Sequence, residues 1–78
     1  MLDPTKNLTK RSLTIAGHRT SISLETEFWT ALGEAAKTQN KSLAALVGEI
    51  DQLRQGRNLS SAIRVWLFSR AQSNIPAP

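Results

Sequence analysis

Apolar and polar side chains alternate with a period of two at one place in this chain, residues 19–24. One face of this segment carries Ile22 and Leu24, with Thr20, and the other carries Arg19, Ser21 and Ser23. Such alternation predicts a half-buried β-strand. Everything after it has a helical pattern, so the strand is expected to have no partner in its own chain and to leave its edges unbonded. We therefore predict that two copies pair their strands across a two-fold axis, as an obligate homodimer.

The apolar period becomes helical after the strand, and this predicts a first helix over about 25–38. Its stripe consists of Phe28, Ala31, Leu32, Ala35 and Ala36. Glu25 and Glu27 are expected in the first turn, where carboxylates interact favourably with the helix dipole. Asn40 is expected to end the helix in the left-handed conformation.

A second helix is predicted over about 43–55. Its N-cap is Ser42, Gly56 ends it, and its apolar positions are Leu43, Leu46, Val47, Ile50 and Leu53. A third segment is capped by Asn58, or by Ser60 if it starts later. This segment is apolar over most of its circumference, with Leu59, Ile63, Val65, Trp66, Leu67 and Phe68. One small protomer would not cover so much apolar surface, so we expect the segment to bury against the partner subunit.

The elements together predict a mainly helical domain over residues 11–70, with a flexible basic arm at 1–10 and a disordered tail at 71–78. Residues 12–15 are β-prone until Ala16-Gly17 interrupts them, and they could extend the strand ribbon briefly. With 78 residues and no cysteine, oligomerisation is the remaining way to supplement a small core. The chain has neither a long apolar span nor a signal-peptide pattern, so a cytoplasmic protein is expected.

Catalysis is not expected, because the chain has no nucleophile elbow, no phosphate-binding glycine loop and no paired acid–base carboxylates. No cofactor is expected either. His18 is the only histidine and has no metal-ligand partners at the usual spacing, so no metal site is predicted. The net charge is +4, and the positive charge lies mostly before and on the strand, with Lys6, Lys10, Arg11 and Arg19 set against Asp3. This favours binding of a polyanion on the strand side.

The order of strand, helix, serine-capped turn and helix resembles the ribbon-helix-helix superfamily of bacterial and phage repressors, as in Arc and MetJ. More narrowly, residues 16–21, Phe28-Trp29, 49–51 and 58–62 resemble a group of short bacterial ribbon-helix-helix proteins. The similarity covers residues 11–69. It implies a homodimer, with a tetramer on DNA left open, whose antiparallel two-stranded ribbon enters the major groove of double-stranded DNA.

The resemblance also assigns roles to residues. Arg19, Ser21 and Ser23 would face the bases. The amides of Ser42 and Leu43, helped by Lys41, would hold a phosphate at a helix N-terminus. Apart from the resemblance, His18 is expected to contact a phosphate or to form a local hydrogen bond, and Arg11 to contact a phosphate. The dimer core would consist of Ile22, Leu24, Phe28, Leu46, Val47 and Ile50.

Two features depart from the family pattern. Ser21 and Ser23 are short where longer polar side chains are usual, so phosphate contacts and DNA shape would contribute more than direct base readout. The third helix lies beyond the minimal unit. We predict a sequence-specific DNA-binding protein, a transcriptional repressor. The alternative is a protein-interaction module, an antitoxin or adaptor, that binds its partner through the third helix.

Overall fold

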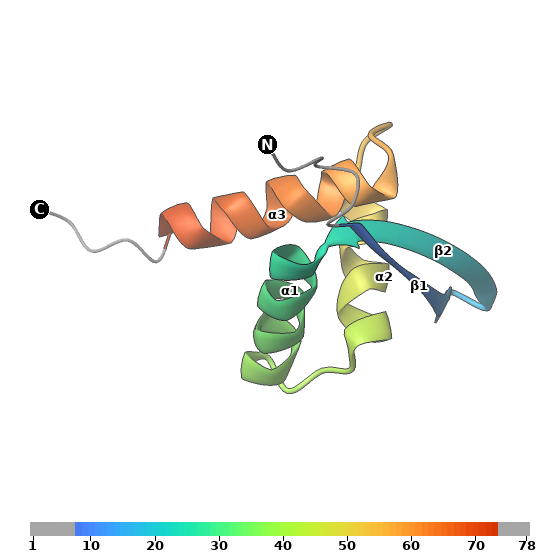
Figure 1. Ribbon diagram of the computed structural model, residues 1–78, viewed down its shortest axis with the longest axis horizontal. Helices are drawn as coiled ribbons and strands as arrows, with labels where there is room; N and C mark the ends of the chain where they lie inside the picture. The colour runs from blue at the N-terminus through green and yellow to red at the C-terminus, as the bar shows by residue number, and fades with distance from the viewer. Residues whose placement is uncertain (1–7, 74–78) are drawn as a thin grey trace, which may run out of the picture.

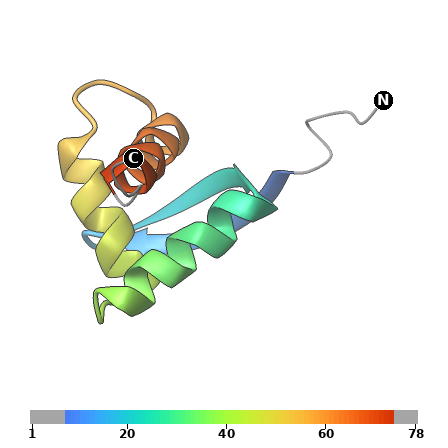
Figure 2. The ribbon, with the colours of Figure 1, turned by 90° about the vertical axis from the view of Figure 1, so that its left-hand side faces the viewer.

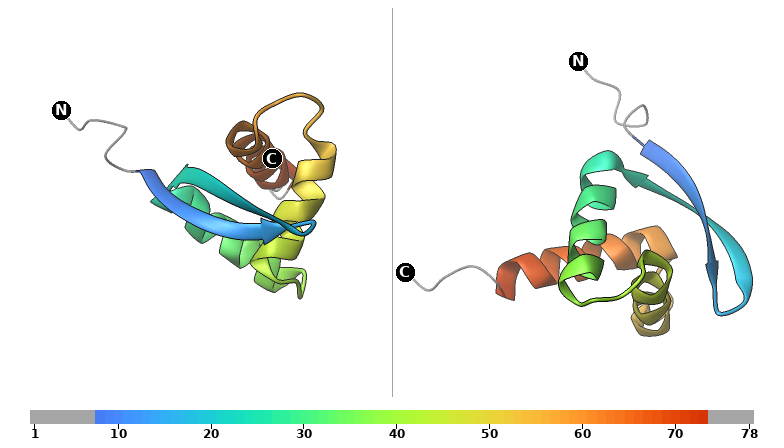
Figure 3. Two further views of the ribbon diagram at one scale, coloured as in Figure 1. Left: turned by 90° about the vertical axis from the view of Figure 1, so that its right-hand side faces the viewer. Right: turned by 90° about the horizontal axis from the view of Figure 1, so that it is seen from below.

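The computed structural model describes residues 8–73 and contains a two-stranded antiparallel sheet followed by three helices (Figure 1). The elements are β1 (Leu8–Ile15), β2 (His18–Glu25), α1 (Thr26–Thr38), α2 (Leu43–Leu53) and α3 (Leu59–Ser73). The prediction of a mainly helical chain, in which a strand and two helices are followed by a third helix, is confirmed. The turn of the hairpin and the C-terminal half of α3 project from opposite sides of the molecule (Figures 1 and 3).

The alternating strand has a partner in its own chain, so that part of the prediction was wrong. β1 pairs with β2 in a regular register that runs from Leu8 opposite Glu25 to Ile15 opposite His18. Ala16 and Gly17 form the two-residue turn, with φ of 52° and 82°. Two positive φ values are typical of the type I′ turn, whose twist matches that of the strands it connects. Pairing of β2 with a second copy is not seen in this single chain and stays a prediction.

The ends of the described region also differ from the expected boundaries. Residues 8–10 belong to β1, because they pair with the last residues of β2. Residues 71–73 belong to α3, where the Ser73 hydroxyl donates to the Ser69 carbonyl at 3.1 Å. The remainder of the expected arm (1–7) and tail (74–78) lies outside the described residues.

The residues predicted to cap the second and third helices do cap α2 and α3. Ser42 is the N-cap of α2, and its Oγ accepts from the Ala45 amide at 3.1 Å. Asn58 is the cap of α3, since its Oδ1 accepts from the Ser61 amide at 2.8 Å. Asn40 has a φ of 59° and Gly56 a φ of 88°, as expected for residues that follow helices, but α2 ends at Leu53, two residues earlier than predicted. Glu25 is the residue before α1 and not part of its first turn.

The core is formed inside a single chain. Five of the six residues expected in a dimer core are at most 2% exposed without any partner: Ile22, Leu24, Leu46, Val47 and Ile50. The sixth, Phe28, is half-buried at the edge of this core. β1 and α3 cover the apolar surface that was predicted to bury against a second copy, and all three helices contact the hairpin (Figure 2).

The third helix divides its apolar residues between the core and the surface. Ala62, Ile63 and Leu67 are buried against the rest of the same chain, so the expectation that α3 buries against a partner is wrong for this face. Trp66 is half-buried, and Phe68 is 63% exposed. The burial of Ile63 and its neighbours fixes α3 to the domain, and the other face of the helix remains open to solvent.

Candidate nucleic-acid interface

The hairpin has one face turned away from the helices, and this face gathers polar side chains from both strands. Residues directly opposite in an antiparallel pair point to the same face. Since Ile22 and Leu24 point into the core, Arg19, Ser21 and Ser23 of β2 must point outward. Their partners across the sheet share this outer face: Thr14 opposite Arg19, Ser12 opposite Ser21, and Lys10 opposite Ser23.

The outer face therefore combines two cations and four hydroxyls. The three residues predicted to face DNA do lie together, and five of the six are exposed, with Ser23 half-buried. The centre of this face carries the short side chains of Ser12 and Ser21, whose hydroxyls lie 3.4 Å apart. Lys10 and Arg19 lie towards opposite ends of the face, about 13 Å apart along the strand direction. Lys10, Ser12 and Thr14 were not predicted to face DNA, although they are alternate polar positions of the chain.

Arg11 does not lie on the outer face. It is opposite Ile22, on the side of the helices, and its guanidinium carbon lies 5.1 Å from the centroid of the Trp29 ring. The Trp29 Nε1 in turn donates to the Thr9 carbonyl at 2.7 Å. The phosphate role expected for Arg11 gains no support from this placement, which gives it a packing role between β1 and α1.

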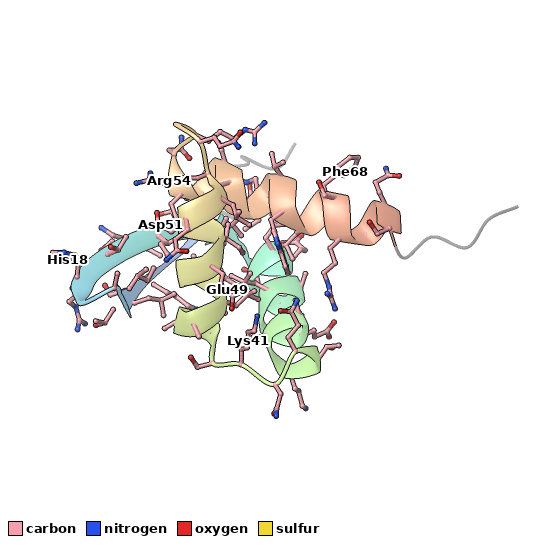
Figure 4. The ribbon with its side chains drawn as sticks, turned by 180° about the vertical axis from the view of Figure 1, so that it is seen from behind. His18, Lys41, Glu49, Asp51, Arg54 and Phe68 are labelled. Carbon is pink, nitrogen blue, oxygen red and sulfur yellow. The ribbon has the colours of Figure 1, made fainter. Side chains whose placement is uncertain are left out.

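His18 begins β2 beside the turn, opposite Ile15, and is exposed at the tip of the hairpin (Figure 4). Its position belongs to the projecting end of the ribbon and not to the outer face. Within residues 8–73, no group of three His, Cys, Asp or Glu side chains lies close enough to hold a metal ion.

The N-terminus of α2 is the second place where a phosphate contact was predicted. Ser42 is exposed and caps the helix, and Leu43 is half-buried against the core. Lys41 points towards Glu49 on α2, with its Nζ 2.6 Å from Oε2 and 2.8 Å from Oε1 (Figure 4). The ammonium of Lys41, which was expected to contact a phosphate, is thus paired with Glu49, and both side chains are partly exposed.

Glu25 connects the last residue of β2 to α3. Its Oε1 accepts from the Nε of Arg64 at 3.0 Å. The Glu25 backbone N–H, and then the Arg64 guanidinium, lower the pKa of the Glu25 carboxyl below its ordinary value. The charged form is therefore favoured in the folded chain.

A lowered pKa in the folded state makes stability depend on pH in a defined direction. The contribution of Glu25 is present above the pKa of the unfolded chain, about 4.3 for Glu, and is lost as the pH falls through the folded value. We expect Glu25→Gln to lower the melting temperature at pH 7, and we expect this difference to shrink as the pH falls from 7 into the acid range. Thermal unfolding of both proteins across this range measures the difference. A difference that stays constant with pH would contradict the prediction.

Comparison with known families agrees with this geometry. The sequence model of the ribbon-helix-helix domain matches residues 8–71, which is most of the chain. The chain belongs to the ribbon-helix-helix domain family. Ribbon-helix-helix domains generally bind DNA as dimers in transcription regulation. The match includes β1 and α3, so both elements belong to the matched unit of this ribbon-helix-helix domain.

One solved structure is similar over nearly the whole domain. It is an uncharacterized protein from Bordetella pertussis Tohama I, with a TM-score of 0.71 and 29% sequence identity. The alignment covers 97% of this chain and 69% of the other. No curated protein matches the sequence. Among residues 8–73, no helix of this ribbon-helix-helix protein is long and apolar enough to cross a membrane.

Proposed function

We propose that this ribbon-helix-helix protein is a cytoplasmic homodimer that binds double-stranded DNA sequence-specifically and represses transcription by occupying an operator. The outer face of the hairpin is the observation that supports this function. It is a two-stranded surface of exposed cations and hydroxyls. The major groove of B-DNA is about 12 Å wide and admits such a ribbon. The function requires neither a catalytic step nor a cofactor.

The side chains of the outer face suit different parts of the DNA. Arg19 has the fork of donors that recognises the O6 and N7 of guanine. Lys10 presents a point charge suited to a phosphate. The four hydroxyls are short and can donate to or accept from several bases, so they discriminate less. Specificity would therefore depend on Arg19 together with the shape of the groove.

We expect Arg19→Ala to weaken binding to the operator by about tenfold, because one good arginine contact to a base contributes about 1–3 kcal/mol. Arg57→Ala is the matched control, since it removes the same charge from the exposed loop between α2 and α3. Crosslinking of the protein to chromosomal DNA would first supply the operator, and titration of the labelled duplex would then give both affinities. Equal losses in the two variants would contradict a base-reading role of Arg19.

A protein-interaction module, as in an antitoxin or adaptor, is the second candidate. A groove of about 790 Å³ between α1 and α3 favours it. Apolar side chains line much of this groove, and two of them, Val65 and Phe68, are 40% and 63% exposed. Exposed apolar surface of this kind marks interaction sites. In this second candidate, Phe68→Ser would abolish partner binding, and Arg19→Ala would leave it unchanged.

A further inference from the structure

The C-terminal half of α3 projects beyond α1, on the opposite side of the molecule from the turn of the hairpin (Figures 1 and 3). The groove of about 790 Å³ lies between these two helices. We propose that this groove is a contact between two copies of the chain, in which the α3 helices pack against each other about a two-fold axis and each covers the groove of the other. The contact is separate from the pairing of strands expected in the homodimer, so it would join one homodimer to the next.

α3 has an apolar stripe that its own domain leaves uncovered. Val65, Phe68 and Ala71 follow one another at steps of three residues, so they lie on one side of the helix. All three are exposed, whereas Ile63 and Leu67 of the same helix are buried in the core. Exposed apolar surface of this kind marks an interaction site.

The floor of the groove suits the same stripe. Phe28 and Ala31 are half-buried there, and Ala35 is buried. The two alanines are small, so the exposed ring of Phe68 from a second copy can lie against α1. Under a two-fold axis each copy contributes both the stripe and the groove. One contact therefore covers both apolar surfaces of each copy.

The charges around the groove favour a second copy as its occupant. Glu27 and Glu34 line it on α1, and Arg64 and Arg70 line it on α3. These two acids and two cations balance, whereas the whole chain has a net charge of +4. Because a net positive chain repels its own copy, a contact between copies is favoured at a face whose charges balance.

The acidic side of the groove also indicates which segment of the second copy fits. Glu27 and Glu34 are exposed and form no ion pair with another residue of 8–73. A segment that covers them should therefore be both apolar and basic. α3 meets this requirement, since its only charged side chains are Arg64 and Arg70. α3 of a second copy would bring its Arg70 towards the acids of α1.

The contact is expected to be weak. α3 has 15 residues and is about 22 Å long. A contact between two helices of this length is expected to bury less than about 1,200 Å², the lower limit for stable protein–protein interfaces. Such a contact is populated at high protein concentration, and this sets the conditions of the test.

Phe68→Ser and Leu53→Ser are a matched pair of variants. Each removes an exposed apolar side chain, 63% exposed at Phe68 and 65% at Leu53, but Leu53 ends α2 and does not line the groove. Sedimentation equilibrium from micromolar to submillimolar concentration measures the mean mass. We expect the mass of the wild type and of Leu53→Ser to rise towards twice its value in dilute solution, and that of Phe68→Ser to stay constant. Identical curves for all three proteins would overturn the inference, whether strands alone assemble the copies or the groove binds a different protein.

An exchange of charges tests the same contact without changing its apolar stripe. Arg70→Glu should weaken self-association by about tenfold, because it places a third acid beside the groove. Lys37→Glu makes the same change of charge on the exposed last turn of α1, outside the groove, and should have no such effect. Addition of Glu34→Arg to Arg70→Glu should restore the association. Equal losses in the two single variants, or no recovery in the double variant, would overturn the inference.

Discussion

Replacement of Trp29 by alanine is expected to lower the free energy of unfolding by about 3–5 kcal/mol, the range for truncation of a large core aromatic side chain. Trp29 is 4% exposed and belongs to the cluster that joins the hairpin to the helices. Its Nε1 donates to Thr9, and its ring lies against the Arg11 guanidinium. The substitution would therefore leave a cavity and also detach β1 from α1.

Urea unfolding measures this loss, and the fluorescence of Trp66 remains available as the signal in the variant. Trp29→Phe is the matched control, because it retains an aromatic ring while it reduces the size of the side chain and removes the hydrogen bond to the Thr9 carbonyl. It should cost less than Trp29→Ala, because the phenyl ring leaves a smaller cavity. A loss below about 1 kcal/mol in Trp29→Ala would mean that β1 does not depend on α1 for its position.

Binding to DNA is expected to weaken steeply as salt is added. Each neutralised phosphate contributes about −0.9 to the slope of log K against log salt concentration. If Lys10 of each protomer neutralises one phosphate, these two contacts give a slope of about −1.8. A fourfold rise in salt would then lower the affinity about twelvefold.

Fluorescence anisotropy of a labelled duplex between 50 and 200 mM salt, about the range in which such losses are measured, gives the slope. Removal of Lys10 should reduce its magnitude by about two for the dimer, while removal of Lys41 should change it little, because this side chain is paired with Glu49. An affinity that hardly changes with salt would contradict an electrostatic interface with DNA. It would favour the protein-interaction module, whose groove is mainly apolar.

Most element boundaries after the turn could be predicted from sequence because their causes are local. β2 has a period of two, and α1 and α2 have continuous apolar stripes. Ser42 and Asn58 cap their helices with side chains that bond three residues ahead, so the signal and the structure lie in the same short segment. The outward position of Arg19, Ser21 and Ser23 followed from the same period.

Residues 12–15 of β1 were expected to be β-prone, but the full strand and its pairing with β2 could not be predicted, because the inner face of β1 is only half apolar. Thr9 and Arg11 occupy inward positions where an apolar residue would have revealed the alternation. They are accommodated by Trp29, which lies 20 residues from Thr9 in the chain. Ala16 also weakens the turn signal, since asparagine or aspartate usually precedes glycine in such turns.

The sequence by itself therefore determined β2, the approximate limits of α1 and α2, the caps of α2 and α3 and one row of the outer face, because each depends on neighbours a few residues away. Only the tertiary structure decided that β1 pairs with β2, that the core closes within one chain, and that Lys10 joins the outer face while Arg11 does not. Those outcomes depend on which distant segments cover the apolar face of β2. A periodic pattern records that a face is buried, but it does not identify the segment that buries it.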